Sequence, residues 1–531
     1  MKKILYAALF CCTSLLTPSC VDDLNQYPHL ETTSENVYTS AENYYKVLAK
    51  IYTSMVTTGQ EKGGGNADLS SNNGQDYMRC YFNLQEIGTD EVAYTWLSGE
   101  NLTDISNLSW DANNSWVSDM YYRIYYNIAL CNEFLRNASD EKISGFSENE
   151  QTAIRQYRAE ARFMRALFYY HAMDLFHDIP FVTENDPVGS FIPPRYTAEQ
   201  IFNFIESELK ELTGENSDLL DKNSCPYGRA SKGAAYTLLA KMYLNAATYI
   251  GTTKYDECIQ ACEAVIEEGY TLEPEYKKLF NADNDKRTNE IIFTLPVDAN
   301  TTVSWGSSTY MVCGAISQTS EYQVPADYGV TKGWGSMRIR KAASSLFQQS
   351  DTRAGFLTEL EGQTQEVTSM DDQSTGYLVT KWTNLTDDGQ QASNTDLNGV
   401  STDYPLFRLA DVYLMYAEAT ARGGQGDMNR ALGYVNALRE RAFGNTSFNV
   451  SQTELTKDNC IFFLDERLRE LYWECSRRTD LIRFNCFTTA DKLWEWKGGS
   501  QAGTSVDSKY NIYPIPATEL SANPNLYNEN Y

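Results

Sequence analysis

The chain has 531 residues and a formal net charge of −27, from 71 acidic against 44 basic side chains. So large a negative charge excludes nucleic acid and anionic lipid as main partners, because both would be repelled. The length allows one large domain or two closely packed ones.

The first twenty residues predict a bacterial lipoprotein. Two lysines precede an apolar run from Ile4 to Leu16, and small residues follow as far as Cys20. This pattern is typical of a secretory signal peptide, and the run is too short for a membrane helix. We predict cleavage after residue 19 and acylation of the Cys20 thiol. The alternative is an ordinary secretory peptide that contains a cysteine by chance.

The predicted organisation is a signal peptide over residues 1–19, a lipidated tether over 20–37 and one domain over 38–531. No later stretch approaches eighteen consecutive apolar residues, so we expect the lipid to be the only anchor. Of the twelve cysteines, Cys11 and Cys12 lie in the leader and Cys20 is the predicted site of acylation. Nine remain, so at least one is unpaired. Cys258 and Cys262 are four residues apart on a predicted helix, which favours core packing.

Apolar periodicity predicts a mainly α-helical scaffold. In residues 150–175 the apolar residues recur at spacings of three and four, which predicts an amphipathic helix. That helix ends near Ile179, because the residue before a proline avoids the helical region. Further helices are predicted over residues 197–212, 229–249, 255–268, 406–421, 427–442 and 463–486.

Two pairs of these helices predict helical hairpins. Residues 229–249 pair with 255–268, and residues 406–421 pair with 427–442 across a glycine-rich turn. Small and large apolar residues alternate along their seams, as in diverged tetratricopeptide units. Two regions rich in Gly, Ser, Asn and Thr, about residues 58–115 and 297–402, predict large irregular inserts in this scaffold. Loops of that length are usually functional surfaces.

Aromatic residues within the inserts indicate a carbohydrate site. Trp96 and Trp334 lie on polar loops with glycine neighbours, and Tyr310 lies in a third such segment. Sugar rings have apolar faces that stack on aromatic planes, and their hydroxyl groups need amide and guanidinium partners. Taken singly, each ring is better explained by local packing; together the three favour a binding surface.

The sequence offers little for catalysis. Its three histidines, His29, His171 and His177, predict neither a catalytic triad nor a metal site. No nucleophile elbow, dinucleotide fingerprint or phosphate-binding loop occurs. We therefore predict that the protein is not an enzyme. A surface glycosidase with two carboxylates stays open as an alternative, although acids such as Asp90 and Glu91 are more simply explained as a solvated face.

Several motifs resemble the SusD/RagB family of outer-membrane lipoproteins. They are RAEARFMRAL at residues 158–167, DIP at 178–180, YPLFRLADVYL at 404–414, ERLREL at 466–471, RTDLIRF at 478–484 and YPIP at 513–516. Residues 21–23 are similar to the acidic signal that directs Bacteroidetes lipoproteins to the cell surface. The resemblance covers nearly the whole chain and implies a tetratricopeptide-like helical scaffold with loop inserts.

The resemblance extends to the starch-binding members of that family. The segments similar to those members are residues 89–91, 308–314, 333–334 and 494–499. It implies an aromatic arc of Trp96, Tyr310 and Trp334 that cradles a curved α-1,4-glucan, with polar contacts from Arg79, Asn101 and Asp76. The spacing between Asp76 and Arg79 is shorter than in the family, and the loop after Trp96 is longer.

The same resemblance implies a calcium site at Asp283 and Asp403. Ser401 stands where a further acid is expected, so this chain has one carboxylate fewer for a hard cation. It also implies delivery of starch or malto-oligosaccharide to a SusC-like TonB-dependent transporter in the outer membrane. The alternatives are the same fold binding another glycan or a peptide, or a purely structural lid on the transporter.

Overall fold

The computed structural model describes residues 34–69, 75–189, 191–318, 322–358, 360–392 and 399–527. The predicted leader, Cys20 and residues 21–33 of the tether lie outside the described residues. The last four tether residues form the short helix α2 (Ser34–Val37). Tyr38 then packs against Tyr44 and Phe134, at ring-centroid distances of 4.9 and 6.2 Å.

Helices dominate the fold, as predicted. The longer helices are α3 (Ala41–Thr53), α4 (Tyr77–Glu86), α6 (Ser115–Asn137), α8 (Glu148–Phe176), α9 (Ala198–Thr213), α10 (Lys232–Leu244), α12 (Tyr255–Glu267), α13 (Ser307–Ala315), α15 (Leu409–Ala421), α16 (Met428–Phe443) and α18 (Ile461–Leu471). The shorter ones are α5 (Thr103–Ser106), α7 (Asp140–Ile143), α11 (Ala246–Ile250), α14 (Lys341–Ser344), α17 (Gln452–Thr456), α19 (Arg477–Arg483) and α20 (Ala517–Ala522). Among the described residues, no helix is both long enough and apolar enough to cross a membrane.

Strands are short and pair two by two. They are β1 (Val92–Tyr94) with β5 (Met337–Ile339), β2 (Ile179–Pro180) with β3 (Arg195–Tyr196), and β4 (Ile291–Leu295) with β6 (Tyr404–Arg408). All three pairs are antiparallel. Two of them join segments more than 100 residues apart in the chain: β1 with β5 links the two inserts, and β4 with β6 brings together the two ends of the second insert.

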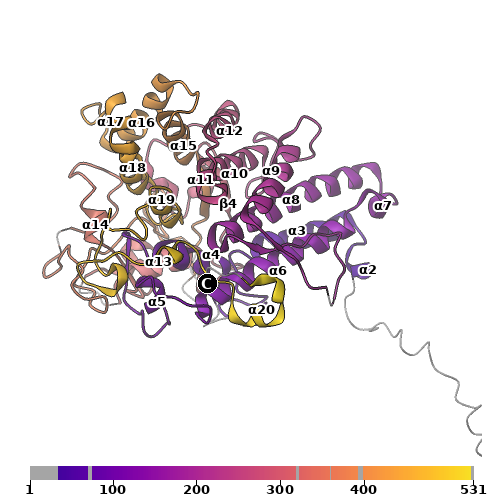
Figure 1. Cartoon of the computed structure of the whole chain (residues 1–531), viewed down its shortest axis with the longest axis horizontal. Coiled ribbons are helices and arrows are strands. Elements are labelled where there is room, and N and C mark those ends of the chain that lie inside the picture. The colour runs from indigo at the N-terminus through magenta and orange to yellow at the C-terminus, as the bar shows by residue number, and fades with distance from the viewer. Residues whose placement is uncertain are drawn as a thin grey trace, which may run out of the picture.

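The helices form a stacked array of antiparallel neighbours. α8 packs against α3 and α6 on one side and α9 on the other, and the stack continues through α10, α12, α15 and α16 (Figure 1). Both predicted hairpins are present, as α10 with α12 and as α15 with α16. The predicted seam residues of α10 are buried, and so are Cys258 and Cys262. All nine cysteines outside the leader and position 20 are free thiols in the structure.

Helix ends differ from the sequence expectation in three places. Residues 404–408 pair with β4, so the helix expected from residue 406 begins at Leu409. The helix expected over residues 229–249 starts at Lys232 and breaks at Asn245. The one expected over residues 463–486 is two helices, α18 and α19, because Trp473 and Cys475 have positive φ angles of 63° and 58°.

A tertiary contact explains that break between α18 and α19. The backbone N–H of Trp473 donates to Glu91 at 2.8 Å, and the N–H of Ser476 donates to Glu86 at 2.9 Å. Both carboxylates come from the first quarter of the chain. They accept backbone N–H groups that a continuous helix would have used internally.

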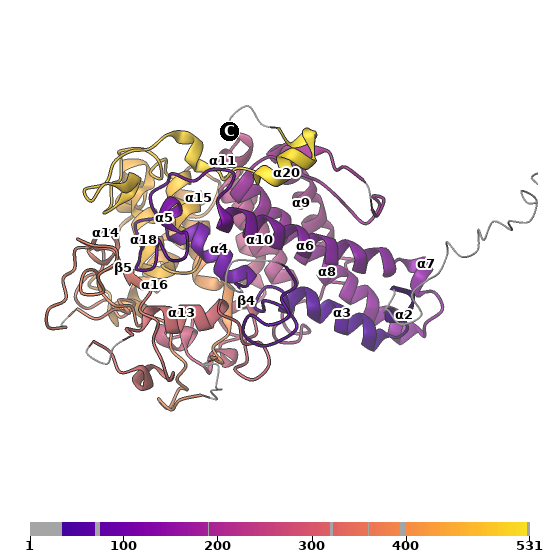
Figure 2. The ribbon, with the colours of Figure 1, turned by 90° about the horizontal axis from the view of Figure 1, so that it is seen from below.

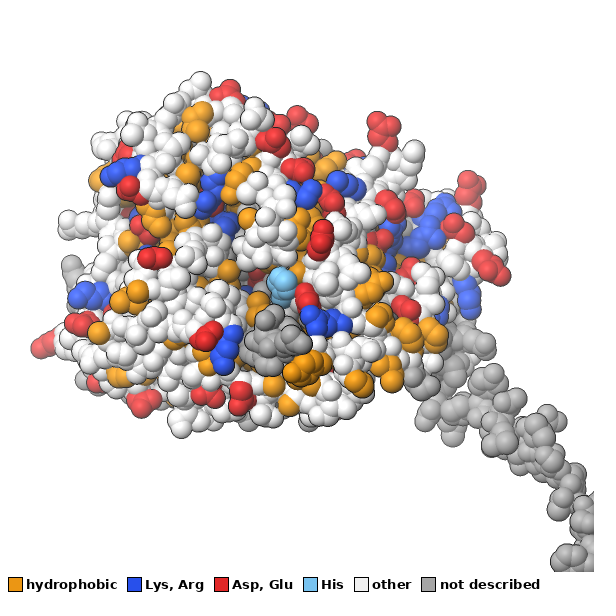
Figure 3. Space-filling view, in the orientation of Figure 1, with side chains coloured by type: hydrophobic (Ala, Val, Ile, Leu, Met, Phe, Trp, Pro, Cys, Tyr) orange, Lys and Arg blue, Asp and Glu red, His pale blue; other side chains and the backbone are white. Residues whose placement is uncertain are grey.

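The two inserts are more regular than predicted. The first contains α4, β1 and α5, and the second contains α13, β5 and α14. In Figures 1 and 2, α5, α13 and α14 lie in the part of the molecule away from α3, α7 and the outer part of α8, and α4 lies near the middle. The face drawn in Figure 3 carries acidic and basic side chains interspersed.

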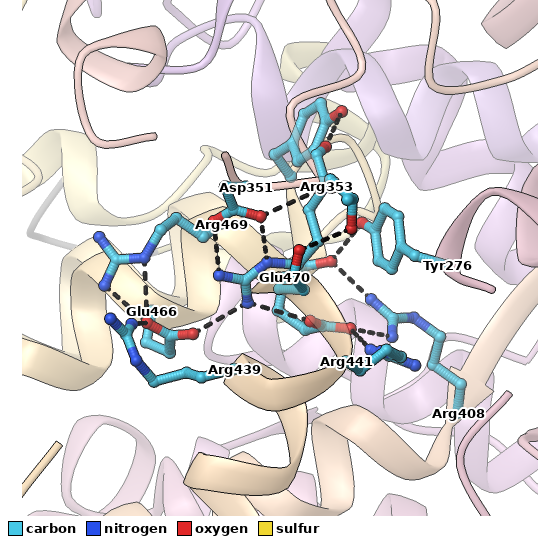
Figure 4. Close-up of polar contacts among 12 residues, drawn as sticks. Tyr276, Asp351, Arg353, Arg408, Arg439, Arg441, Glu466, Arg469 and Glu470 are labelled. Carbon is cyan, nitrogen blue, oxygen red and sulfur yellow. Dashed lines mark hydrogen bonds and ion pairs between the residues drawn. The ribbon is translucent and has the colours of Figure 1, made fainter. Parts of the chain in front are cut away.

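A buried network of ion pairs attaches the second insert to the scaffold (Figure 4). Arg353 of the insert lies 2.9 Å from Glu466 and 3.2 Å from Glu470, both on α18, and 2.7 Å from Asp351. Arg408 of β6 also reaches Glu470, at 2.6 Å. Burial alone would raise the pKa of Glu466, but the surrounding arginines outweigh burial and lower it to about 2. Glu466 therefore stays ionised inside the protein.

Candidate functional site

Three tryptophans from distant segments meet on two buried tyrosines. Trp96, Trp305 and Trp334 are each partly exposed, and Tyr94 and Tyr310 are buried beneath them. Ring-centroid distances form a chain: 6.5 Å from Trp96 to Tyr94, 6.4 Å to Tyr310, 6.4 Å to Trp334 and 6.3 Å to Trp305. We call these five residues the tryptophan platform. The three predicted aromatic residues are thus brought together.

Strand pairing aligns two of the tryptophans. In the antiparallel pair of β1 and β5, Tyr94 faces Met337, and the Thr95 N–H donates to the Ser336 carbonyl at 2.7 Å. Trp96 directly follows Thr95, and Trp334 comes two residues before Ser336. Both tryptophans therefore lie at the same end of the β1–β5 pair. The Trp334 N–H also donates to the Cys313 carbonyl of α13 at 2.7 Å. The backbone around Trp334 is therefore held by the β1 segment on one side and by α13 on the other.

Trp305 is held by a loop from the other insert. The Gly63 N–H donates to the Val303 carbonyl at 2.9 Å. A Cβ atom at Gly63 would lie 3.2 Å from the Trp305 ring, and the φ angle of Gly63 is +67°. A side chain would be strained at this position, so glycine lets the loop approach the indole closely.

Arg79 supports the platform from below. Its guanidinium carbon lies 4.2 Å from the centroid of the Tyr310 ring, within the range of a cation–π contact. Its Nη2 donates to Glu100 at 2.6 Å, and its Nη1 donates to the Trp305 carbonyl at 2.9 Å. Burial alone would lower the pKa of this guanidinium, but the adjacent tyrosines and Glu100 outweigh burial and raise it.

Asp76 is also buried within the site. It is the N-cap of α4 and accepts from the Arg79 N–H at 2.8 Å and from the Ser304 hydroxyl at 2.5 Å. A Cβ atom at Gly306 would lie 2.0 Å from its Oδ1, so only glycine fits there. Burial raises the pKa of Asp76. Asp76 and Arg79 both lie at the platform and have protein partners; direct contact with a glycan stays a prediction for both.

Asn101 lies at the exposed edge of the Trp96 loop. Its side-chain Nδ2 donates to the Ser115 hydroxyl at 2.9 Å, and its φ angle is +57°. The loop is closed by the Leu102 N–H, which donates to the Leu97 carbonyl at 2.8 Å. The neighbouring Glu100 carbonyl accepts from the Trp116 indole at 2.6 Å. Asn101 is therefore available to solvent on an anchored loop.

Three residues at the site, two in the platform and one beside it, are absent from the sequence prediction. These are Trp305, Tyr94 and Glu100. Trp305 stands beside Gly306 in the second insert, so the glycine-neighbour criterion used for Trp334 also applies to it. Tyr94 and Glu100 carry no comparable signal, because their role is to bind Arg79, which reaches them from α4.

The carboxylates near Trp96 in sequence are neither solvated nor at the platform surface. Asp90 is fully buried and receives two hydrogen bonds from Arg477, at 2.6 and 2.7 Å. Glu91 is buried and accepts from the Trp473 N–H. The expectation of a solvated acidic face is wrong for this pair, because both side chains fix the C-terminal helices. Neither side chain is placed to reach a sugar on the platform.

The predicted calcium residues have protein partners. Asp283 pairs with Lys286 at 2.8 Å and accepts from the Asp387 N–H at 2.8 Å. Asp403 accepts from the Val297 N–H at 2.7 Å and from the Tyr227 hydroxyl. Across the part of the chain that the structure describes, no three His, Cys, Asp or Glu side chains gather as a metal site. The residues present do not make a ready calcium chelate, and calcium binding stays a prediction.

Two protein-family models match the chain. Residues 355–531 match the one described as "SusD family", and residues 29–244 match the one described as "Starch-binding associating with outer membrane". Over its full length the chain is 32% identical to the starch-binding protein SusD of Bacteroides thetaiotaomicron, covering 99% of that protein. It is 25% identical to SusD-like protein P25 of Formosa agariphila, covering 96% of this chain and 95% of that one.

Solved structures share the fold at lower identity. Surface glycan-binding protein A from Bacteroides uniformis superposes with a TM-score of 0.70 and 21% identity, over 92% of this chain and 99% of that one. Surface glycan-binding protein A from Bacteroides thetaiotaomicron, in complex with laminarihexaose, gives a TM-score of 0.69 and 19% identity over the same shares. These relatives are described as binding proteins, not as enzymes.

Proposed function

The chain belongs to the SusD family, and on this premise we propose that it is a cell-surface protein that captures starch and malto-oligosaccharides. The observation that carries the proposal is the tryptophan platform. Three partly exposed indoles stand on buried tyrosines, and the ion pair of Arg79 and Glu100 fixes the support beneath them. Aromatic faces suit the apolar faces of sugar rings, and a rigid platform limits the entropy lost on binding.

The choice of α-1,4-glucan rests on a relative that matches the whole chain. The starch-binding SusD protein matches this chain from end to end, and the aromatic residues inferred from that resemblance meet at one place. A relative of the same fold was solved with laminarihexaose, so a β-1,3-glucan is the competing ligand. The proposal favours starch because sequence identity to the laminarihexaose-bound protein is lower, at 19% against 32%.

Affinity electrophoresis in gels containing amylopectin or laminarin tests this function. We expect retardation by amylopectin, and we expect Trp96→Ala and Trp334→Ala each to weaken it at least about tenfold, or about 1.4 kcal/mol. Leu493→Ala, at an exposed apolar residue, is the control and should leave retardation unchanged. Retardation by laminarin alone would overturn the starch assignment. Release of new reducing ends from starch would support the glycosidase alternative.

We further propose that acylated Cys20 anchors the protein to the outer membrane, where it delivers glycan to a SusC-like TonB-dependent transporter. Support comes from the lipoprotein pattern of the leader and from the outer-membrane description of the matching family model. Replacing Cys20 by Ser should release the protein from the membrane fraction of its native host. Co-purification of a TonB-dependent transporter with the wild-type protein tests the partner.

A further inference from the structure

A pocket lies near the tryptophan platform. It has a volume of about 280 Å³ and lies between α3, the turn at residues 227–229 and the segment from Leu295 to Thr302. This volume is near the lower end for small-molecule sites, so it suits one or two sugar rings. We call it the Tyr45–Tyr227 pocket.

Two exposed tyrosines line this pocket. Tyr45 is 45% exposed and Tyr227 is 42% exposed, which is unusual for large aromatic side chains in this protein. Both are nevertheless held in place. The Tyr227 hydroxyl donates to Asp403, and the Tyr45 ring lies 5.6 Å from that of Tyr157. Exposed but fixed rings lose little freedom when a sugar stacks on them.

Polar groups at the pocket suit a neutral ligand. Arg229 uses Nε and Nη2 to bind Glu160, so its charge is balanced, and its Nη1 has no hydrogen-bond partner among the described residues. Asp298 accepts from the Asn300 N–H and the Thr301 hydroxyl through Oδ1 alone, each at 2.9 Å. A free donor and a free acceptor therefore accompany the two rings, as sugar hydroxyls require.

The walls of the pocket are fixed by close packing. Gly228 has a φ angle of +75°, and a Cβ atom there would lie 2.4 Å from the Pro296 side chain. Glycine thus lets the turn bearing Tyr227 approach the end of β4. Asp403 joins the two walls, because it accepts from both Tyr227 and the Val297 N–H. The pocket is therefore preformed.

The pocket and the platform are joined along two segments. Thr302 lines the pocket, and Trp305 follows three residues later, a separation of at most about 10 Å in extended chain. Val56, near the end of α3, also lines the pocket, and the loop that follows carries Gly63 to the Trp305 ring. Figure 2 shows this loop between α3 and α13. A short oligosaccharide is long enough to reach from one site to the other.

We propose that the Tyr45–Tyr227 pocket is a second subsite for the glycan chain that the tryptophan platform holds. The pocket takes sugar units beyond those on the platform, with stacking on Tyr45 and Tyr227 and hydroxyl contacts to Arg229 and Asp298. This inference rests on the proposed function of the platform. It predicts that a longer glycan chain binds more tightly than a short one, because only the longer chain reaches both sites.

Calorimetric titration of the mature protein with maltotriose and maltoheptaose tests the inference, with laminaritriose and laminarihexaose as a parallel pair. We expect Tyr45→Ala, alone and together with Tyr227→Ala, to weaken binding of the long sugar at least fivefold. Binding of the trisaccharide should change less than twofold, because the platform is intact. Tyr45→Phe keeps the ring and leaves the hydrogen bond from Tyr227 to Asp403 in place, so it should retain most of the affinity for the long sugar.

Unchanged affinity for the long sugar in Tyr45→Ala would overturn the inference, and so would an equal loss for both lengths. Tyr45 is exposed, so this variant folds even if Tyr227→Ala does not. Trp96→Ala separates the two proposals, since it should weaken both lengths equally. If Trp96→Ala has no effect on binding while Tyr45→Ala weakens binding of the long sugars, only the proposed function of the platform is contradicted. No binding of either series to the wild type would overturn both proposals.

Discussion

Arg79 joins three parts of the tryptophan platform through one buried guanidinium. It stacks under Tyr310, pairs with Glu100 of the Trp96 loop and donates to the Trp305 carbonyl. Its side chain is only 4% exposed. Removing one partner of such a buried pair leaves the other charge without compensation, which is more costly than the pair itself is stabilising. The residue therefore positions the rings whether or not it also contacts sugar.

We expect Arg79→Ala to lower the free energy of unfolding by about 3 kcal/mol, because Glu100 loses the positive charge that compensates its own. Urea unfolding measures this loss. In the double variant Arg79→Met, Glu100→Gln the uncompensated charge is absent, so a large part of the stability should return. A single variant as stable as the wild type would contradict the positioning role of Arg79.

Trp305 should contribute to glycan binding about as strongly as the predicted tryptophans. Trp305→Ala removes the last ring of the platform, and we expect the dissociation constant for maltoheptaose to rise about tenfold, or about 1.4 kcal/mol. Trp305→Tyr keeps an aromatic face and should lose less. Calorimetric titration measures both. Equal affinity in Trp305→Ala and the wild type would show that Trp305 only packs against Gly63 and Trp334.

At the scale of elements, the second insert depends on α18. Arg353 brings the insert to Glu466 and Glu470, and all three side chains are fully buried (Figure 4). The strands β1 and β5 then place Trp96 beside Trp334. The helix α18 therefore helps to position the binding surface, because its buried acids hold the insert that carries Trp334.

We expect Arg353→Ala to destabilise the protein by about 3–5 kcal/mol, because it leaves the buried Asp351 without its ion-pair partner and removes one partner each from Glu466 and Glu470. Arg430→Ala is the matched control. Arg430 forms an exposed pair with Glu263 across the surface, and such pairs contribute about 0–1 kcal/mol. Urea unfolding of both variants gives the comparison. Equal losses would mean that the buried network does not attach the insert.

At the scale of the whole molecule, the buried pair of Glu86 and Glu91 contributes stability that falls as pH rises. Burial raises the pKa of Glu86 well above its usual value, and the adjacent Glu91 raises it further. Burial also raises the pKa of Glu91 to about 8, although Arg477 opposes this shift. The folded pair therefore holds a proton that the unfolded chain loses near its ordinary pKa. Stabilisation from that proton is complete below the ordinary pKa and is lost as pH rises toward 8.

Urea unfolding at pH 5, 6.5 and 8 tests this dependence. Glu91→Gln cannot ionise and keeps an oxygen for the Trp473 N–H, so it isolates the contribution of the pair. We expect the free energy of unfolding of the wild type, relative to that of Glu91→Gln, to fall by an amount on the order of 2 kcal/mol between pH 5 and pH 8. Parallel curves for the variant and the wild type would rule out the pair as the source.

Local patterns in the sequence determined the helical scaffold. The long helix α8, the two hairpins and the burial of Cys258 and Cys262 follow from apolar spacing, because each pattern lies within one segment. Family resemblance and glycine neighbours also indicated Trp96, Tyr310 and Trp334, which do meet. Periodicity was less informative for α6, where tyrosines lie on several faces of the helix.

Only the tertiary structure decided what supports the site. Trp305 joins the platform because a glycine loop from the other insert packs on it, and Arg79 reaches Glu100 from a different element. Glu86 and Glu91 break a helix nearly 400 residues away by accepting its backbone N–H groups. Such partners are chosen by burial, since a charge or N–H group removed from water must find whichever group the fold brings near. No pattern within one segment carries that information.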